Sequence, residues 1–211
     1  MQNERTFNAW SQMLGIFYKP RATFLEINQH PKWLLPFSTV LLLNAGFVFL
    51  FFSSGNVPLA GRIMLYTGYA IGAALSILIS STVFLLSLSV QSVPVSFKKV
   101  LSVVTHTYFL YTVVSVILAT LILKLSPVSS SIDPQNPILS NPGILVNPQL
   151  HPALYRLAVS FDLLSLYFLI LTGFGFSVIS KKMSFKRSMF TVIGVWSVYV
   201  AAVVLIKVIV T

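Results

Sequence analysis

Hydrophobic residues in this chain gather in five long runs that are separated by shorter polar segments. The runs cover residues 34 to 54, 63 to 90, 100 to 123, 157 to 180 and 188 to 206. Each reaches or approaches the roughly 20 residues that an α-helix needs to cross about 30 Å of hydrocarbon. They lack the alternation of polar and apolar positions that transmembrane strands require. The pattern therefore predicts an all-α integral membrane protein, with a bundle of five transmembrane helices over residues 34–211.

Residues 1–33, which precede the first run, have the pattern of a short amphipathic helix at the membrane surface. Apolar and aromatic side chains recur there at helical spacing, and Pro20 fits the first turn of a further helical segment. The residues expected to anchor this segment at the interface are Trp10, Phe17, Pro20, Phe24, Ile27 and Trp33. Their apolar face fits either direct contact with lipid or packing against the cytoplasmic ends of the bundle.

Small residues form a stripe along the second run. Gly68, Gly72, Ser76 and Ser80 follow one another at intervals of four, so they share one face of a helix. Such a face lets two helix backbones approach closely, which is a main source of helix association in lipid. Gly173 and Ser177 repeat the spacing in the fourth run. The pattern predicts tight helix contacts at these positions, and it leaves open whether the neighbouring helix belongs to the same chain.

The segment 126–156, between the third and fourth runs, is rich in proline. Asn-Pro and His-Pro pairs punctuate it, and proline removes a backbone donor and favours extended conformations in the residue before it. We expect an irregular outer loop with short turns that rests partly on the membrane or caps the bundle.

Composition and charge agree with a membrane location. Hydrophobic residues make up 56% of the chain and charged residues 9%. Taking the runs in order, ten of the fourteen Lys and Arg residues fall on the side of the N-terminus. Because Lys and Arg concentrate in cytoplasmic loops, the N-terminus is expected inside and the C-terminus outside. Basic residues beside anionic headgroups also account for the net charge of +10 without a nucleic-acid partner.

The sequence lacks the residue patterns of the common catalytic sites. The three histidines stand far apart, and we find neither an HExxH motif nor a GxSxG motif nor a phosphate-binding glycine loop. With no cysteine, thiol catalysis and thiolate metal sites are excluded. We therefore expect a non-enzymatic protein that has no metal and no cofactor.

Asp162 is the one acidic residue within the five runs. An ionisable group inside a membrane is costly unless it is paired or faces water, so it is a functional candidate by default. Counting along the helices places Lys207, and also Lys124, at a similar depth near the outer side. A structural charge pair of Asp162 with one of these lysines is the first interpretation, and a proton or substrate site is the alternative. His106 fits a hydrogen-bonded packing residue better than a ligand.

Two segments carry a resemblance to a known family. The run SFDLLSLYFLILTGFGFSVISKKMSFKRSMFTVIGVW, from Ser160 to Trp196, resembles the C-terminal half of the Yip1 domain family, in which an Asp opens a helix that ends in Gly before a last helix. The segment MLGIFYKPRATFLEINQHPKW is similar to the opening of bacterial members. The Phe that commonly neighbours the Asp precedes it here, as Phe161.

The resemblance implies a five-helix, non-enzymatic protein of a bacterial inner membrane. Some bacterial members accompany ABC-type exporters that have periplasmic adaptor subunits and help them to assemble, so the leading hypothesis is a scaffold or assembly partner of such a complex, with the bilayer and exporter subunits as partners and homo-oligomers as a further possibility. One alternative is a transporter of small molecules or lipids around Asp162. Another is a membrane-shaping or trafficking-type protein, as eukaryotic members act in vesicle traffic.

Overall fold

The computed structural model describes residues 8–52, 58–125, 140–180 and 182–210, apart from the side chains of 50–52, 123–125 and 207–210. Every regular element within these ranges is a helix. In chain order the elements are α1 (Ala9–Tyr18), α2 (Pro20–Gln29), α3 (Leu34–Phe52), α4 (Leu59–Val90), α5 (Phe97–Leu125), the 3-10 helix η2 (Pro142–Leu145), α6 (Pro152–Val159), α7 (Leu163–Ile179) and α8 (Phe185–Val210).

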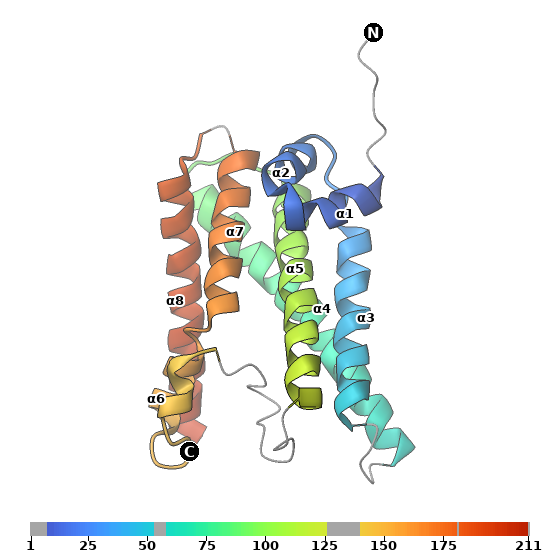
Figure 1. Cartoon of the computed structure of the whole chain (residues 1–211). Coiled ribbons are helices and arrows are strands. Elements are labelled where there is room, and N and C mark those ends of the chain that lie inside the picture. The colour runs from blue at the N-terminus through green and yellow to red at the C-terminus, as the bar shows by residue number, and fades with distance from the viewer. Residues whose placement is uncertain (1–7, 53–57, 126–139, 181, 211) are drawn as a thin grey trace.

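The long helices form a bundle with distinct ends (Figure 1). The helices α1 and α2 and the connection from α4 to α5 lie at one end, which we call the α1–α2 end. The helix α6 and the last turn of α8 lie at the opposite end. Since successive long helices run in opposite directions, the first turns of α5 and α8 and the turn before α8 share the α1–α2 end, as the alternation of the sequence predicts. These segments carry Lys98, Lys99, Lys182 and Lys186.

Three helices are long and apolar enough on their own to cross a membrane. They are α4, α5 and α8, and a fourth crossing is reached if α6 and α7 together form one bent span. The helix α3 has 19 residues and is about 28 Å long, close to the thickness of the hydrocarbon. The part of α3 with described side chains, Leu34–Phe49, is shorter than α4, α5 and α8. The structure thus shows a helical membrane protein with three to four candidate spans, and the count of five remains a prediction.

The fourth span differs from the expected continuous helix over 157 to 180. The chain bends by 51° between α6 and α7, and α6 begins at Pro152, inside the segment expected to be an outer loop. Asp162 explains the break, because its carboxylate accepts a hydrogen bond from the Ser165 amide at 3.0 Å and so caps the start of α7. An N-cap residue has an extended backbone, which cannot continue the preceding helix.

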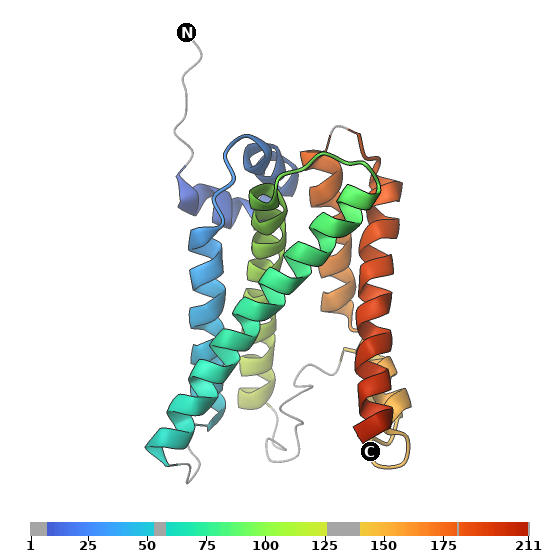
Figure 2. The ribbon, with the colours of Figure 1, turned by 180° about the vertical axis from the view of Figure 1, so that it is seen from behind.

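The helix α4 crosses the bundle obliquely, as Figure 2 shows from behind. Its 32 residues give a length of about 48 Å, well beyond the thickness of the hydrocarbon. It packs against α3 near the opposite end and reaches α8 at the α1–α2 end. Tilting lets such a long apolar helix remain in the hydrocarbon, and it also separates the middle of α4 from α8.

The N-terminal segment forms a helical hairpin that packs on the α1–α2 end. Pro20 stands in the first turn of α2, as predicted, where its missing amide donor costs nothing. Gly15 lets α1 approach α2, since a Cβ there would lie 2.5 Å from Thr23 Oγ1. The buried Gln12 side chain donates from Nε2 to the His30 carbonyl at 3.2 Å, which ties α1 to the end of α2.

Candidate functional site

The small-residue stripe of α4 does not contact another helix at its two glycines. A Cβ built on Gly68 or on Gly72 would meet no atom within 4 Å in the described part of the chain. Both glycines and Ser76 are exposed, whereas Ser80 is half-buried. The structure therefore supplies no partner for the stripe from the described residues of this chain.

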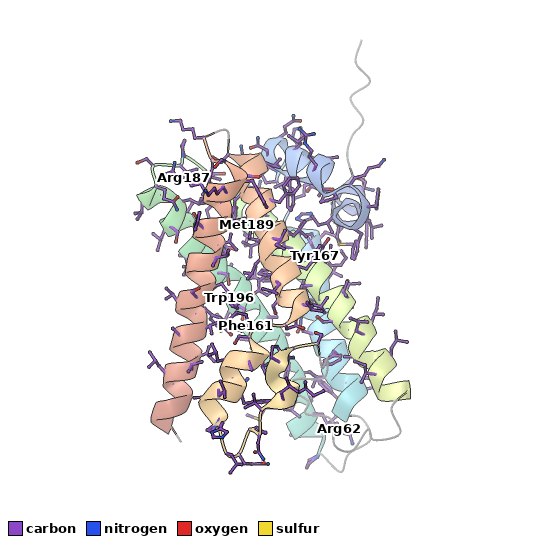
Figure 3. All side chains as sticks on the ribbon, turned by 60° about the vertical axis from the view of Figure 1, so that its left-hand side comes forward. Arg62, Phe161, Tyr167, Arg187, Met189 and Trp196 are labelled. Atoms are coloured by element: carbon purple, nitrogen blue, oxygen red, sulfur yellow. The ribbon has the colours of Figure 1, made fainter. Side chains whose placement is uncertain are left out.

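Gly173 in α7 lies in a close helix contact. A Cβ at this position would come within 2.5 Å of Met189 Sδ, and Figure 3 shows Met189 on α8 beside α7. Ser177, one turn further, donates its hydroxyl to the Phe174 carbonyl at 2.7 Å. The missing side chain of Gly173 thus brings α7 and α8 together.

Gly175 makes a second close contact, which the spacing rule for small residues did not single out. A Cβ there would lie 2.6 Å from Val103 and 2.9 Å from Phe24, so α7 meets both α5 and the hairpin at this point. The Gly-Phe-Gly triplet of residues 173–175 is the signal that was available, because two glycines two apart lie on different faces of one helix.

Asp162 is bound by serine side chains at the junction of α6 and α7. The Ser140 hydroxyl, from the segment between α5 and α6, donates to Oδ1, and the Ser165 hydroxyl donates to Oδ2 at 3.3 Å. Phe161 packs edge-to-face on Trp196 of α8, with ring centroids 5.3 Å apart (Figure 3). The helix break is therefore fixed both to the loop and to α8.

The predicted charge pair of Asp162 with Lys207 or Lys124 cannot be placed in the same way. Both lysine side chains lie outside the described residues. The contacts above give Asp162 a structural role as a helix cap that does not depend on a lysine, and the pair stays a prediction.

The predicted interfacial anchors divide between the core and the surface. Phe24 and Ile27 are wholly buried, and the Phe24 ring meets Phe174 of α7 with centroids 6.0 Å apart. Trp10 and Phe17 are 54% and 41% exposed. One face of the hairpin therefore packs on the bundle. Trp10 of α1 stays largely uncovered, whereas Phe17 is partly covered by Phe109 of α5, with ring centroids 5.7 Å apart. Trp33, at the start of α3, is partly buried.

The three histidines lie on three different elements of the fold. His30 follows α2, His106 lies within α5 and His151 precedes α6. The His106 ring is wholly buried and its Nδ1 donates to the Ser102 carbonyl at 2.7 Å, which leaves Nε2 as an acceptor without a partner among the described residues. Those residues contain no cluster of three His, Asp or Glu side chains that could hold a metal ion.

A groove of about 560 Å³ lies between α3, α4 and α5. Its lining residues are Asn44, Met64, Leu65, Gly68, Tyr69, Gly72, Ala73, Ser76, Tyr108, Tyr111 and Thr112. None of them is charged, and the stripe of α4 forms one wall. Such a surface offers apolar contact and neutral hydrogen-bonding groups, which suits binding rather than acid–base or nucleophilic catalysis.

Comparison with known proteins agrees with the helical architecture. The model of the Yip1 domain family matches residues 14–206, which include the second half of α1, every helix from α2 to α7 and most of α8. Neither the search of curated proteins nor that of solved structures found a match to the chain. The match extends over nearly the whole sequence and over several apolar helices, and the protein is therefore a multi-pass membrane protein of the Yip1 domain family.

Proposed function

We propose that this protein is a non-enzymatic scaffold in a bacterial inner membrane, where it helps an ABC-type exporter with a periplasmic adaptor to assemble. The observation that carries the proposal is the uncovered surface of α8. Only 17% of the apolar stretch of α8 is buried by the described residues, compared with 61% for that of α5. A helix that these residues cover so little has most of its surface available to other membrane helices.

Gly194 makes α8 suited to a close contact. It is exposed near the middle of the helix, and a Cβ there would meet nothing within 4 Å among the described residues. Phe190 and Val198, one turn to either side, are 68% and 71% exposed. A glycine flanked by larger apolar side chains lets a second backbone approach while those side chains pack around it.

Quantitative co-purification tests the proposal. The tagged chain is isolated from its own host membranes in a mild detergent, and the recovery of exporter subunits is measured by mass spectrometry. Gly194→Leu should remove most of the recovered subunits, whereas Gly46→Leu, at an exposed glycine of α3 with equally open surroundings, should not. Equal recovery with both variants, or recovery without exporter subunits, would contradict the proposal.

We also propose five crossings, with the N-terminus inside. Ten basic residues against four support the orientation, and the length of α3 supports the count. Because the chain has no cysteine, single cysteines are unambiguous reporters. A cysteine in place of Ser92 should react with membrane-impermeant maleimide only after cells are opened, while one in place of Gln149 should react in intact spheroplasts. The reverse pattern would overturn the orientation.

The exposed face of α1 favours a second candidate function, membrane shaping. Trp10, Leu14, Phe17 and Tyr18 are between 41% and 65% exposed on a helix that lies across the end of the bundle. Aromatic side chains at this level can insert among headgroups and widen one leaflet. Vesicles reconstituted with the wild-type protein should then be smaller than vesicles with Trp10→Ser. Equal sizes would exclude this function.

A further inference from the structure

The groove between α3, α4 and α5 has a shape that its glycines determine. Gly68 and Gly72 leave open space where any other residue would place a side chain, and both face the outside of the bundle. Asn44 stands on α3, ten residues after its start, so it lies about 15 Å from the α1–α2 end. The groove therefore opens sideways toward lipid at roughly the middle of the hydrocarbon.

Thr112 has an unusual environment among the threonines of α5. Thr105, Thr107 and Thr120 each donate the hydroxyl to a carbonyl one turn earlier in the helix, over 2.6 to 2.9 Å. Thr112 makes no such bond, and its hydroxyl has no hydrogen-bond partner within the part of the chain that the structure describes. Yet the residue is only 7% exposed and lines the groove. A hydroxyl left unpaired away from water costs about 1–3 kcal/mol, so an occupant that pairs with it gains affinity.

The lining excludes a charged occupant at this depth. All eleven lining residues are neutral, and an ionised headgroup would be desolvated beside them without a counter-ion. The nearest basic residues along α5 are Lys98 and Lys99 at its start, and Thr112 lies about 20 Å further along the helix. The phosphate group of a lipid would therefore meet basic residues at the α1–α2 end of the bundle and not in the groove.

The unpaired Thr112 hydroxyl favours a lipid over a helix of another protein. The backbone groups of a helix are satisfied internally and could not pair with Thr112. A lipid chain is narrower, and the space matches the roughly 300–1,000 Å³ of ordinary ligand sites.

We propose that this groove is a binding site for an uncharged lipid, of the diacylglycerol type, that enters from the bilayer. Its acyl chain lies along Gly68 and Gly72, and its hydroxyl or ester carbonyl pairs with the Thr112 hydroxyl. Asn44 and Tyr111 supply further neutral hydrogen-bonding groups on the two flanking helices. The site is separate from the α8 surface proposed for assembly, so each can fail without the other.

Photolabelling of the purified full-length chain tests the site. The protein is reconstituted in phosphatidylcholine vesicles with a diacylglycerol that carries a diazirine on one acyl chain, and the labelled peptides are mapped by mass spectrometry. Labelling should concentrate on α4 between Leu65 and Ser76 and on α5 near Thr112, saturate, and be displaced by unlabelled diacylglycerol. A phosphatidylglycerol probe with the same chain should label these peptides at least tenfold less.

Four variants make the result specific. Gly72→Leu fills the groove and should abolish saturable labelling, whereas Gly194→Leu on α8 should leave it unchanged. Thr112→Val keeps the shape but removes the hydroxyl, so the apparent affinity should fall about fivefold, and Thr112→Ser should restore it. Thermal unfolding checks that each variant is folded. If Gly72→Leu does not fold, the comparison of Thr112→Val with Thr112→Ser decides the question.

Three outcomes would overturn the proposal. They are equal labelling by the anionic probe, labelling of α4 and α5 that does not saturate, and an unchanged affinity in Thr112→Val. A disulfide-linked dimer of Gly72→Cys, formed in the same vesicles on this cysteine-free background, would instead place a second copy of the chain on the groove and exclude the lipid.

Discussion

Arg187, in the first turn of α8, holds Gln91 at the end of α4. Its Nε donates to Gln91 Oε1 at 3.0 Å and its guanidinium also donates to the Gln91 carbonyl at 2.9 Å (Figure 3). The side-chain amide of Gln91 donates in turn from Nε2 to Thr191 Oγ1 at 2.7 Å. The next residue, Ser92, has a φ of 57°, which non-glycine residues seldom adopt. These contacts attach the tilted α4 to α8 where the chain turns toward α5.

Replacing Arg187 should therefore loosen α4 at this end. Arg187→Met removes two hydrogen bonds from an exposed guanidinium, so we expect a loss of about 1 kcal/mol in the free energy of unfolding, measured by thermal denaturation in detergent. Lys186→Met is the matched control, because Lys186 is equally exposed and makes no hydrogen bond within the described ranges. Equal losses in both variants would show that the contact to Gln91 contributes nothing.

The two glycines Gly173 and Gly194 provide a direct comparison of packed and open positions. Gly173→Leu must displace Met189, so we expect it to destabilise the protein by about 1–3 kcal/mol. Gly194→Leu meets open space and should leave the unfolding temperature of the purified protein unchanged. Similar stability of the two variants would mean that α7 and α8 do not pack as closely as the structure shows.

The sequence predicted the helices well because apolar runs of this length have few other solutions. It also predicted that an Asp opens the helix of α7, through the family resemblance, and that Pro20 begins a helix. The break before Asp162 was hidden, since apolar residues continue through Phe161 and Leu163 and a cap differs from an interior residue only in its backbone.

The sequence also could not show that the small-residue stripe of α4 is uncovered, for a different reason. In a soluble protein, apolar residues mark the core, but in a membrane the lipid-facing and the buried faces of a helix are both apolar. Gly68 and Gly173 therefore look alike in sequence, although the first is open and the second is pressed against Met189. Only the tertiary arrangement separates a small residue that packs from one that lines a groove.

Substitutions of Asp162 distinguish a cap from a charge pair. Asn is as good an N-cap as Asp, so if capping is its main role Asp162→Asn should change the free energy of unfolding little, whereas Asp162→Ala should cost about 1 kcal/mol. A pair with Lys207 predicts instead that Asn and Ala are equally harmful, because both remove the charge. Combining each with Lys207→Met in a double-mutant cycle, read by thermal unfolding, measures any coupling between the two side chains.

Glu26 should make the stability of the hairpin depend on pH. Burial raises the pKa of this carboxyl above its ordinary 4.5, and Lys32, Gln12 and His30 oppose the shift without cancelling it. The folded protein therefore holds this proton to a higher pH than the unfolded chain does. Its contribution to stability is complete below about pH 4.5 and is lost as the pH rises through the raised pKa of the folded state.

Glu26→Gln imitates the protonated carboxyl at every pH. We expect it to match the wild type at roughly pH 4 and to be more stable than the wild type near neutral pH, in unfolding measured over a pH series. Because the charge of His30 also acts on the Glu26 carboxyl, the comparison is repeated in a His30→Gln background, which should keep the difference. A wild type that gains stability relative to Glu26→Gln as the pH rises would show that the attraction of Lys32 outweighs burial, because the ionised carboxylate would then be the form that the folded hairpin prefers.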